Sequence, residues 1–124
     1  MRAFKIAALA APLLLVAGCA KSPESTVESF YTAVGKGQIT EAQSYLSQQI
    51  VALLGPQKIS AALAKESTRV GECGGIKSVE VKLSGEGEVR QGSATVSYKG
   101  QCPAKTEAVK LIQEDGKWKI GAAK

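Results

Sequence analysis

The spacing of apolar residues changes near the middle of the chain. In the first part, apolar side chains recur every three or four positions, which is typical of amphipathic helices. The clearest example is one face formed by Val27, Phe30, Tyr31 and Val34, which follows a helix-start signal at Ser22-Pro23-Glu24. The predicted helical segments are residues 23–34, 39–46, 50–54 and 59–65.

After Gly74-Gly75 the apolar residues alternate with polar ones, which is typical of strands with one buried face. The predicted strands are residues 78–83, 93–99, 109–112 and 118–120. Asp115-Gly116 lies between the last two, and this dipeptide favours the type I′ turn of a tight hairpin. Helices followed by an antiparallel meander predict an α+β domain.

The first nineteen residues have the composition of a secretory signal. A short cationic start, Met1 to Lys5, precedes an apolar run from Ile6 to Ala17. That run is about a dozen residues long, whereas a membrane-spanning helix needs roughly 20. Small residues then lead directly to Cys19. We therefore expect residues 1–18 to be a signal peptide.

Val16-Ala17-Gly18-Cys19 resembles the lipobox of bacterial lipoproteins. The resemblance implies that the Cys19 thiol receives a diacylglyceryl group and that cleavage then leaves Cys19 as the new N-terminus. Residues 19–22 would be a lipidated tether, and residues 23–124 a single domain. Ala20 and Lys21 follow the cysteine, without the aspartate that retains many lipoproteins at the inner membrane. By resemblance, this favours the outer membrane, facing the periplasm.

The remaining cysteines form a pair. With Cys19 assigned to the lipid, Cys73 and Cys102 are left, and an even remainder in an oxidising compartment is most simply a disulfide. A two-cysteine metal site and a redox pair are the alternatives. Both are weaker interpretations, because the chain has no histidine and no Cys-x-x-Cys spacing.

The whole mature chain resembles a group of small bacterial lipoproteins that carry a domain of unknown function. The resemblance rests on the lipobox, on the helix from Ser25 to Val34, on the segment Gly37 to Ala42, and on the closing segment Glu114 to Ile120. It implies a cystatin-like or nuclear-transport-factor-2-like fold, in which N-terminal helices pack on a curved antiparallel sheet of about four strands. In that fold the sheet wraps the first helix and can form a conical pocket.

Candidate catalytic residues are scarce. Related cone-shaped enzymes place an acid or a histidine inside an apolar cone, where burial tunes its pKa. Glu28 lies between the apolar positions of the first helix and is the one acid that could approach the cone, although a solvated helix position is the simpler interpretation. No Gly-x-Ser-x-Gly motif is present. We therefore predict a protein that is not an enzyme and has no catalytic residues, metal or cofactor.

The aromatic residues allow two interpretations. Phe30, Tyr98 and Trp118 occupy apolar phases and are most simply core, with Trp118 packing on the Phe30 side of the first helix. Alternatively, Tyr31, Tyr98 and Trp118 line a shallow ligand groove, since phenol and indole rings offer both apolar surface and a hydrogen-bond donor.

The charge of the chain limits its partners. Lys and Arg total 16 and Asp and Glu total 11, but the basic residues are spread along the chain without a cluster. This argues against nucleic acid. We expect a cell-envelope lipoprotein, held to the membrane through its N-terminal lipid, that binds an envelope protein or a small apolar ligand. The alternatives are a small enzyme that uses Glu28 and a cystatin-like protease inhibitor.

Overall fold

The computed structural model describes residues 21–123, so the predicted signal peptide and Cys19 lie outside the described residues. The helices are α2 (Pro23–Gly35), α3 (Ile39–Ser44), α4 (Gln48–Leu54) and α5 (Pro56–Glu72). The strands are β1 (Ile76–Ser84), β2 (Val89–Tyr98), β3 (Lys105–Glu114) and β4 (Lys117–Gly121). All neighbouring strands are antiparallel, in the order β1-β2-β3-β4. The predicted α+β fold is confirmed.

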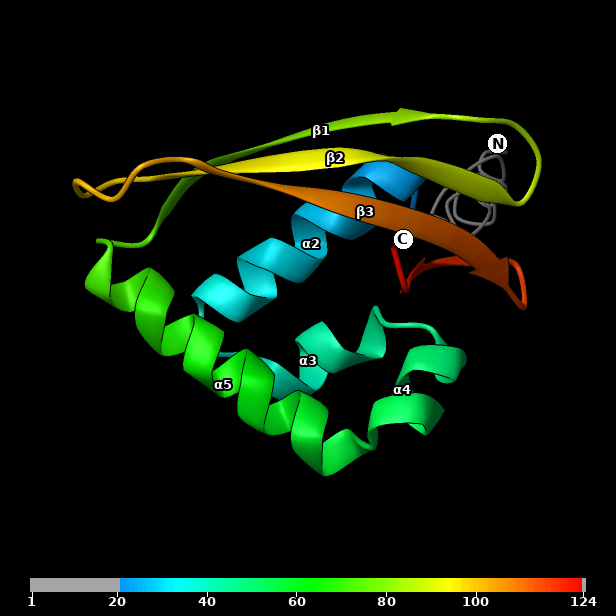
Figure 1. Cartoon of the computed structure of the whole chain (residues 1–124), viewed down its shortest axis with the longest axis horizontal. Helices are drawn as coiled ribbons and strands as arrows, with labels where there is room; N and C mark the ends of the chain where they lie inside the picture. Colours follow the sequence, from blue (N-terminus) through cyan, green and yellow to red (C-terminus); the bar gives the residue numbers. More distant parts are fainter. Residues whose placement is uncertain (1–20, 124) are drawn as a thin grey trace, which may run out of the picture.

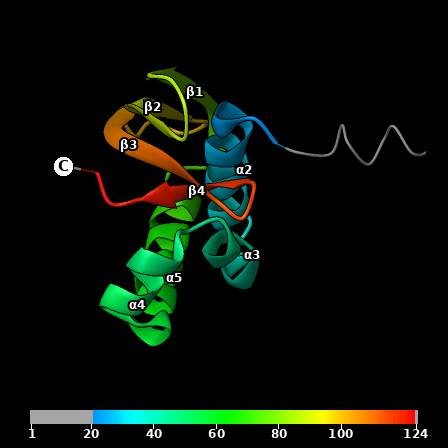
Figure 2. The ribbon, with the colours of Figure 1, turned by 90° about the vertical axis from the view of Figure 1, so that its right-hand side faces the viewer.

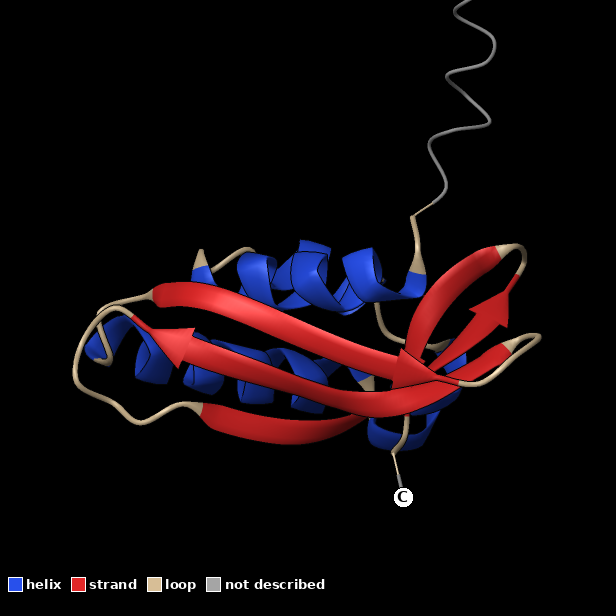
Figure 3. Cartoon of the chain, turned by 90° about the horizontal axis from the view of Figure 1, so that it is seen from above, coloured by secondary structure: helices blue, strands red, loops and turns tan. Residues whose placement is uncertain are grey.

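The elements form layers (Figure 1). The curved sheet lies on one side, α2 runs directly beneath it, and α3, α4 and α5 lie beyond α2. Seen from above, the long strands cross over the helices (Figure 3). The outer edge of β4 is not free, because the connection between α3 and α4 forms backbone hydrogen bonds with it. The Ile120 N–H donates to the Tyr45 carbonyl over 2.8 Å, and the Ser47 N–H donates to the Ile120 carbonyl over 2.9 Å.

Local signals in the sequence place the element ends. The Ser22 hydroxyl accepts a hydrogen bond from the Ser25 N–H over 3.0 Å and caps α2, and the Ser47 hydroxyl caps α4 in the same way. In the β3–β4 turn, Asp115 and Gly116 have φ values of 52° and 78°. Positive φ at both positions is what a type I′ turn requires, so the predicted hairpin is confirmed.

Helix α5 is longer than the sequence pattern predicted. We expected it to end near Lys65, but it continues to Glu72. The polar run from Glu66 to Arg69 interrupts the apolar periodicity without breaking the helix. Val70 then restores the buried stripe, seven residues after Leu63, and is 2% exposed. Strands β2 and β3 likewise begin several residues before their predicted starts.

The core consists of three clusters of buried residues. One joins α2, α3 and α5 around Val34 and Leu63. The second joins α2 to the sheet and contains Val27, Ala94, Val109 and Leu111. The third joins the end of α5 to β1 and β2. None of the helices within residues 21–123 is both long and apolar enough to cross a lipid bilayer.

The placement predicted for Trp118 is wrong in one respect. Its ring is half-buried and packs on the cluster around Val27 and Leu111, whereas Phe30 packs in the cluster around Val34. The two rings are on different sides of α2, because Val27 faces the sheet and Phe30 faces the other helices. The outer face of Trp118 is covered by the Arg90 guanidinium, which lies 5.0 Å from the ring centroid.

Candidate functional site

Two tyrosines bring polar groups into the space between the sheet and the helices. Tyr31 on α2 donates a hydrogen bond from its hydroxyl to the Glu107 carboxylate on β3 over 2.5 Å. Tyr98, at the end of β2, accepts a hydrogen bond from the Arg69 guanidinium on α5 over 2.7 Å. Glu107 reaches Tyr31 because it lies two residues before the buried Val109 on β3, and residues two apart in a strand point to the same, here helical, side of the sheet.

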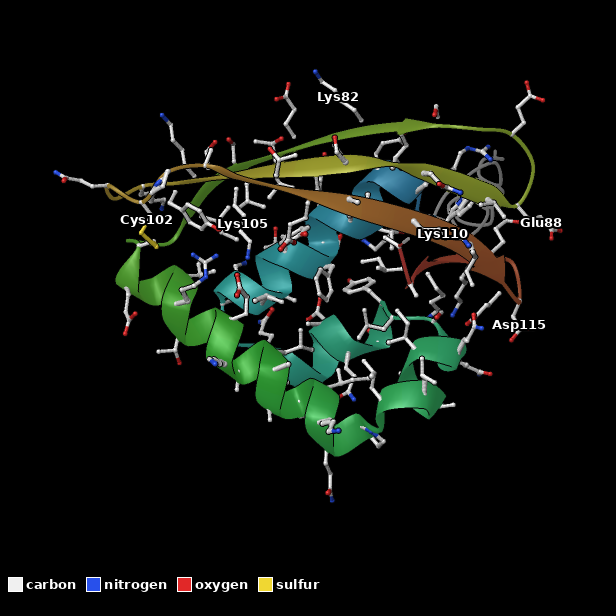
Figure 4. All side chains as sticks on the ribbon, in the orientation of Figure 1. Lys82, Glu88, Cys102, Lys105, Lys110 and Asp115 are labelled. Carbon is white, nitrogen blue, oxygen red and sulfur yellow. A yellow bond between two sulfur atoms is a disulfide. The ribbon has the colours of Figure 1, made fainter. Side chains whose placement is uncertain are left out.

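Two ion pairs extend these contacts. The Lys105 ammonium lies 3.1 Å from the Glu107 carboxylate, and the Arg69 guanidinium lies 2.7 Å from the Glu66 carboxylate. Lys105 is labelled in Figure 4, in the space between β3 and the helices. We call the whole set the polar network; it consists of Tyr31, Glu66, Arg69, Tyr98, Lys105 and Glu107. The four charged side chains are each between 33% and 44% exposed, so solvent or a partner can reach them.

The two halves of the network influence each other electrostatically. Burial first, and then the hydrogen bond to Glu107, raise the pKa of Tyr31 well above its ordinary value of 10.0, and the Glu66 charge adds to this. The hydrogen bond from Arg69 lowers the pKa of Glu66, with a smaller contribution from Lys105. The same hydrogen bond also stabilises the charged guanidinium and so raises the pKa of Arg69. At neutral pH the network therefore holds a neutral Tyr31 beside charges of both signs.

The predicted disulfide closes one end of this site. Cys73 directly follows α5 and Cys102 lies in the β2–β3 connection, and the two sulfur atoms are bonded (Figure 4). Their Cα atoms are 5.4 Å apart. The disulfide predicted from the sequence is therefore present in the structure. It fixes α5, which carries Glu66 and Arg69, against the end of β2, which carries Tyr98.

Glu28 is not inside the cone. The structure places it on the exposed side of α2, where it lines a groove between α2 and β1. The reason is the helix phase, because Val27 and Val34 turn towards the core and leave Glu28 facing solvent. The predicted alternative that Glu28 lies inside an apolar cone is therefore wrong.

The aromatic groove predicted from the sequence is not formed as one surface. Tyr31 and Tyr98 both belong to the polar network, and Tyr98 is 7% exposed. Trp118 lies apart and lines a pocket that contains neither tyrosine. Two of the three residues therefore share a site, although they act there as hydrogen-bonding groups in the interior.

The sequence analysis missed the four charged members of the network. Glu66 and Arg69 lie beyond the predicted end of the fourth helix, and Lys105 and Glu107 precede the predicted start of the third strand. Their spacing did contain a signal, since Glu66 and Arg69 are three residues apart and face the same side of a continued helix. Alternation back from Val109 likewise places Glu107 on the inner face.

Comparison with known proteins supports the fold. No protein-family model matches the chain, and no curated protein sequence matches it. Among solved structures, the chain is similar to a protein from Campylobacter jejuni that carries the name "Putative NTF2-like transpeptidase". The match has a TM-score of 0.72 and 17% sequence identity, and it covers 82% of this chain and 99% of the other. At this identity the likeness shows a nuclear-transport-factor-2-like fold and nothing about activity.

The chemistry available at the polar network is recognition by charge and hydrogen bonding. Tyr31 is held as a donor, Lys105 and Arg69 supply positive charge, and Glu66 and Glu107 supply negative charge. Among residues 21–123, no group of three or more His, Cys, Asp or Glu side chains is placed to hold a metal ion.

Proposed function

We propose that this protein is a lipid-anchored lipoprotein of the cell envelope whose domain binds another envelope protein without catalysis. The observation that supports the binding role is the polar network. Its charged groups are accessible, yet each is held in place by a hydrogen bond or ion pair with another member. A partner with complementary charges would meet a site that is already ordered, which lowers the entropic cost of association.

Catalysis is the weaker proposal for this site. The structural neighbour is named a transpeptidase, and acyl transfer generally uses an activated nucleophile beside a base. In this chain Cys73 and Cys102 are bonded to each other, and the sequence contains no histidine. The raised pKa of Tyr31 keeps its proton in place, so this residue serves as a donor rather than as a base.

A protein partner is favoured over a small apolar ligand. At the closed end of the cone, Val27 and Leu111 are both 0% exposed and fill the space between α2 and the sheet. The accessible part of the cone carries charged side chains instead. Between α2 and the sheet, an apolar molecule would have to displace either a packed core or paired charges, and both changes are unfavourable.

The anchor is tested by replacing Cys19. In the Cys19→Ala variant, we expect loss of lipid labelling and of signal cleavage at this position, because acylation precedes cleavage in the proposed maturation. Radiolabelled palmitate and membrane fractionation measure the two effects. Normal processing and membrane retention of the variant would contradict the anchor.

The binding site is tested by photo-crosslinking in intact envelopes. A benzophenone amino acid is placed at Thr68, which is exposed and lines the same groove on α5 as Glu66 and Arg69. The control position is Lys82, exposed on β1 on the opposite side of the sheet (Figure 4). We expect a discrete adduct from position 68 only, and its loss when Arg69→Gln is added. Identical adducts from both positions, unaffected by Arg69→Gln, would contradict the site.

A further inference from the structure

A basic pocket lies beside the start of the described chain. It has a volume of about 330 Å³ and brings together the beginning of α2, the end of α3 and the β3–β4 hairpin. Figure 2 shows this hairpin and the start of α2 on the same side of the molecule. The pocket is lined by Lys21, Thr26, Ser44, Tyr45, Gly116, Lys117, Trp118 and Lys119.

The charge of this pocket is entirely positive. Its lining contains three lysines and no acidic residue. The Lys21 ammonium donates to the Ser29 hydroxyl over 3.1 Å, and the Lys119 ammonium donates to the Ser44 carbonyl over 2.6 Å, so both contacts are with neutral oxygens. Within residues 21–123, none of the three lysines forms a salt bridge. The Glu41 carboxylate accepts a hydrogen bond from the Tyr45 hydroxyl over 3.3 Å, so one acid lies next to a lining residue. The three lysines themselves remain without an acidic partner within the described residues, and they favour an anionic ligand.

One acid of the hairpin, Glu114, is already engaged. Glu114 is the cross-strand neighbour of Lys117, but both of its carboxylate oxygens lie 3.2 Å from the Gln48 N–H. This contact directs the carboxylate towards the start of α4. Within residues 21–123 Lys117 forms no salt bridge, so its positive charge is available to an external ligand.

Aromatic rings complete the pocket. The Lys21 ammonium lies 6.0 Å from the centre of the Tyr45 ring, and Arg90 covers the Trp118 ring at 5.0 Å. Tyrosine and tryptophan are the residues most enriched where proteins meet the headgroup region of a membrane, because one end of each ring is apolar and the other is polar. Lysines beside Tyr45 and Trp118 are therefore the composition expected of a headgroup site.

The distance of the pocket from the predicted lipid anchor indicates which anion it binds. Lys21 is two residues after Cys19, and two residues span at most about 7 Å in any conformation. If Cys19 carries the lipid, as proposed above, the membrane surface lies within reach of this pocket. We propose that the pocket docks on the membrane and binds the phosphate of an anionic phospholipid headgroup, which fixes the orientation of the domain and of the polar network relative to the bilayer.

Trp118 provides a direct measurement, since it is the only tryptophan of the chain. The acylated full-length mature protein is reconstituted into vesicles of phosphatidylcholine alone or with one-third phosphatidylglycerol, each carrying a spin label in the headgroup region. We expect stronger quenching of Trp118 in the anionic vesicles, and a decrease of this difference at high salt. Each lysine near an anionic surface strengthens membrane binding about five-fold. The triple variant Lys21→Gln/Lys117→Gln/Lys119→Gln should therefore weaken docking of the pocket on the order of 100-fold.

A matched variant separates docking from general attraction. Lys65→Gln/Lys82→Gln/Lys99→Gln removes the same charge from exposed positions elsewhere, and it should keep the quenching difference. Equal quenching in both vesicle types, or equal effects of the two triple variants, would overturn the proposal.

Two further experiments distinguish a failure of the anchor from a failure of the pocket, and a lipid headgroup from free phosphate as the ligand. Binding to neutral vesicles, measured by flotation, depends on the acyl anchor alone. A protein that fails to float with these vesicles overturns the anchor. A protein that floats but shows no difference in quenching between the two vesicle types overturns the proposed pocket. Inorganic phosphate is added to the neutral vesicles at constant ionic strength. A change in Trp118 emission equal to that in anionic vesicles would show a site for free phosphate, and it would overturn the assignment to a lipid headgroup.

Discussion

Removal of the disulfide is the sharpest test of how this small domain is held together. Cys73 and Cys102 are separated by 29 positions in the sequence. Closing a loop of this length lowers the entropy of the unfolded chain and stabilises the fold by about 3–4 kcal/mol in the loop-entropy treatment. A domain of this size is typically stable by about 5–15 kcal/mol, so the bond supplies a large share.

Packing adds a second contribution. Cys73 is 4% exposed and packs with Val70, Val96 and Tyr98. Replacing its sulfur by the hydrogen of alanine leaves a small void, which costs on the order of 1 kcal/mol. For Cys73→Ala/Cys102→Ala we therefore expect the free energy of unfolding to fall by about 4–5 kcal/mol.

Urea unfolding followed by circular dichroism measures this change. The slope of the free energy against urea should also increase, because an unfolded chain without the crosslink exposes more surface. The reduced wild-type protein is the control, since it loses the loop constraint but keeps the sulfur atoms in place. A loss below about 1 kcal/mol in both samples would refute the loop-closure reasoning.

Three further predictions concern single side chains. Leu111→Ala should lower the free energy of unfolding by about 2–5 kcal/mol in urea titrations, because Leu111 is 0% exposed; a neutral effect would contradict its place in the core. Trp118→Ala should cost less, about 2 kcal/mol, because its ring is half-buried, and a complete loss of folding would contradict this placement. The pKa of Glu66 is lowered by its pairing with Arg69, so this pair stabilises the fold at pH values above the ordinary Glu pKa of 4.5. The stabilisation is lost as the pH falls through the lower pKa of the folded state. Glu66→Gln should therefore flatten the acid side of a melting-temperature profile, and a profile identical to that of the wild type would contradict the pair.

The sequence by itself determined the elements whose signals are local. Apolar residues at helical spacing on α2, alternation along β1 and the Asp115-Gly116 turn each depend on a few consecutive residues, and each is found in the structure. The disulfide partners followed from counting cysteines, and the geometry then had only to bring two segments together. The lipid on Cys19 also comes from the sequence, and it remains a prediction.

Only the tertiary structure decided which polar residues form sites. Tyr31 and Glu107 are far apart in the chain, and they meet because α2 packs beneath β3. In sequence, spacing can place Glu107 on the inner face of β3 and Arg69 beside Glu66, but it carries no record of which side chain each one faces across the core. The same applies to Trp118, whose exposure depends on how far the β3–β4 hairpin covers the beginning of α2. Local periodicity determines secondary structure, whereas the packing of distant elements determines the environment of each charged or aromatic group.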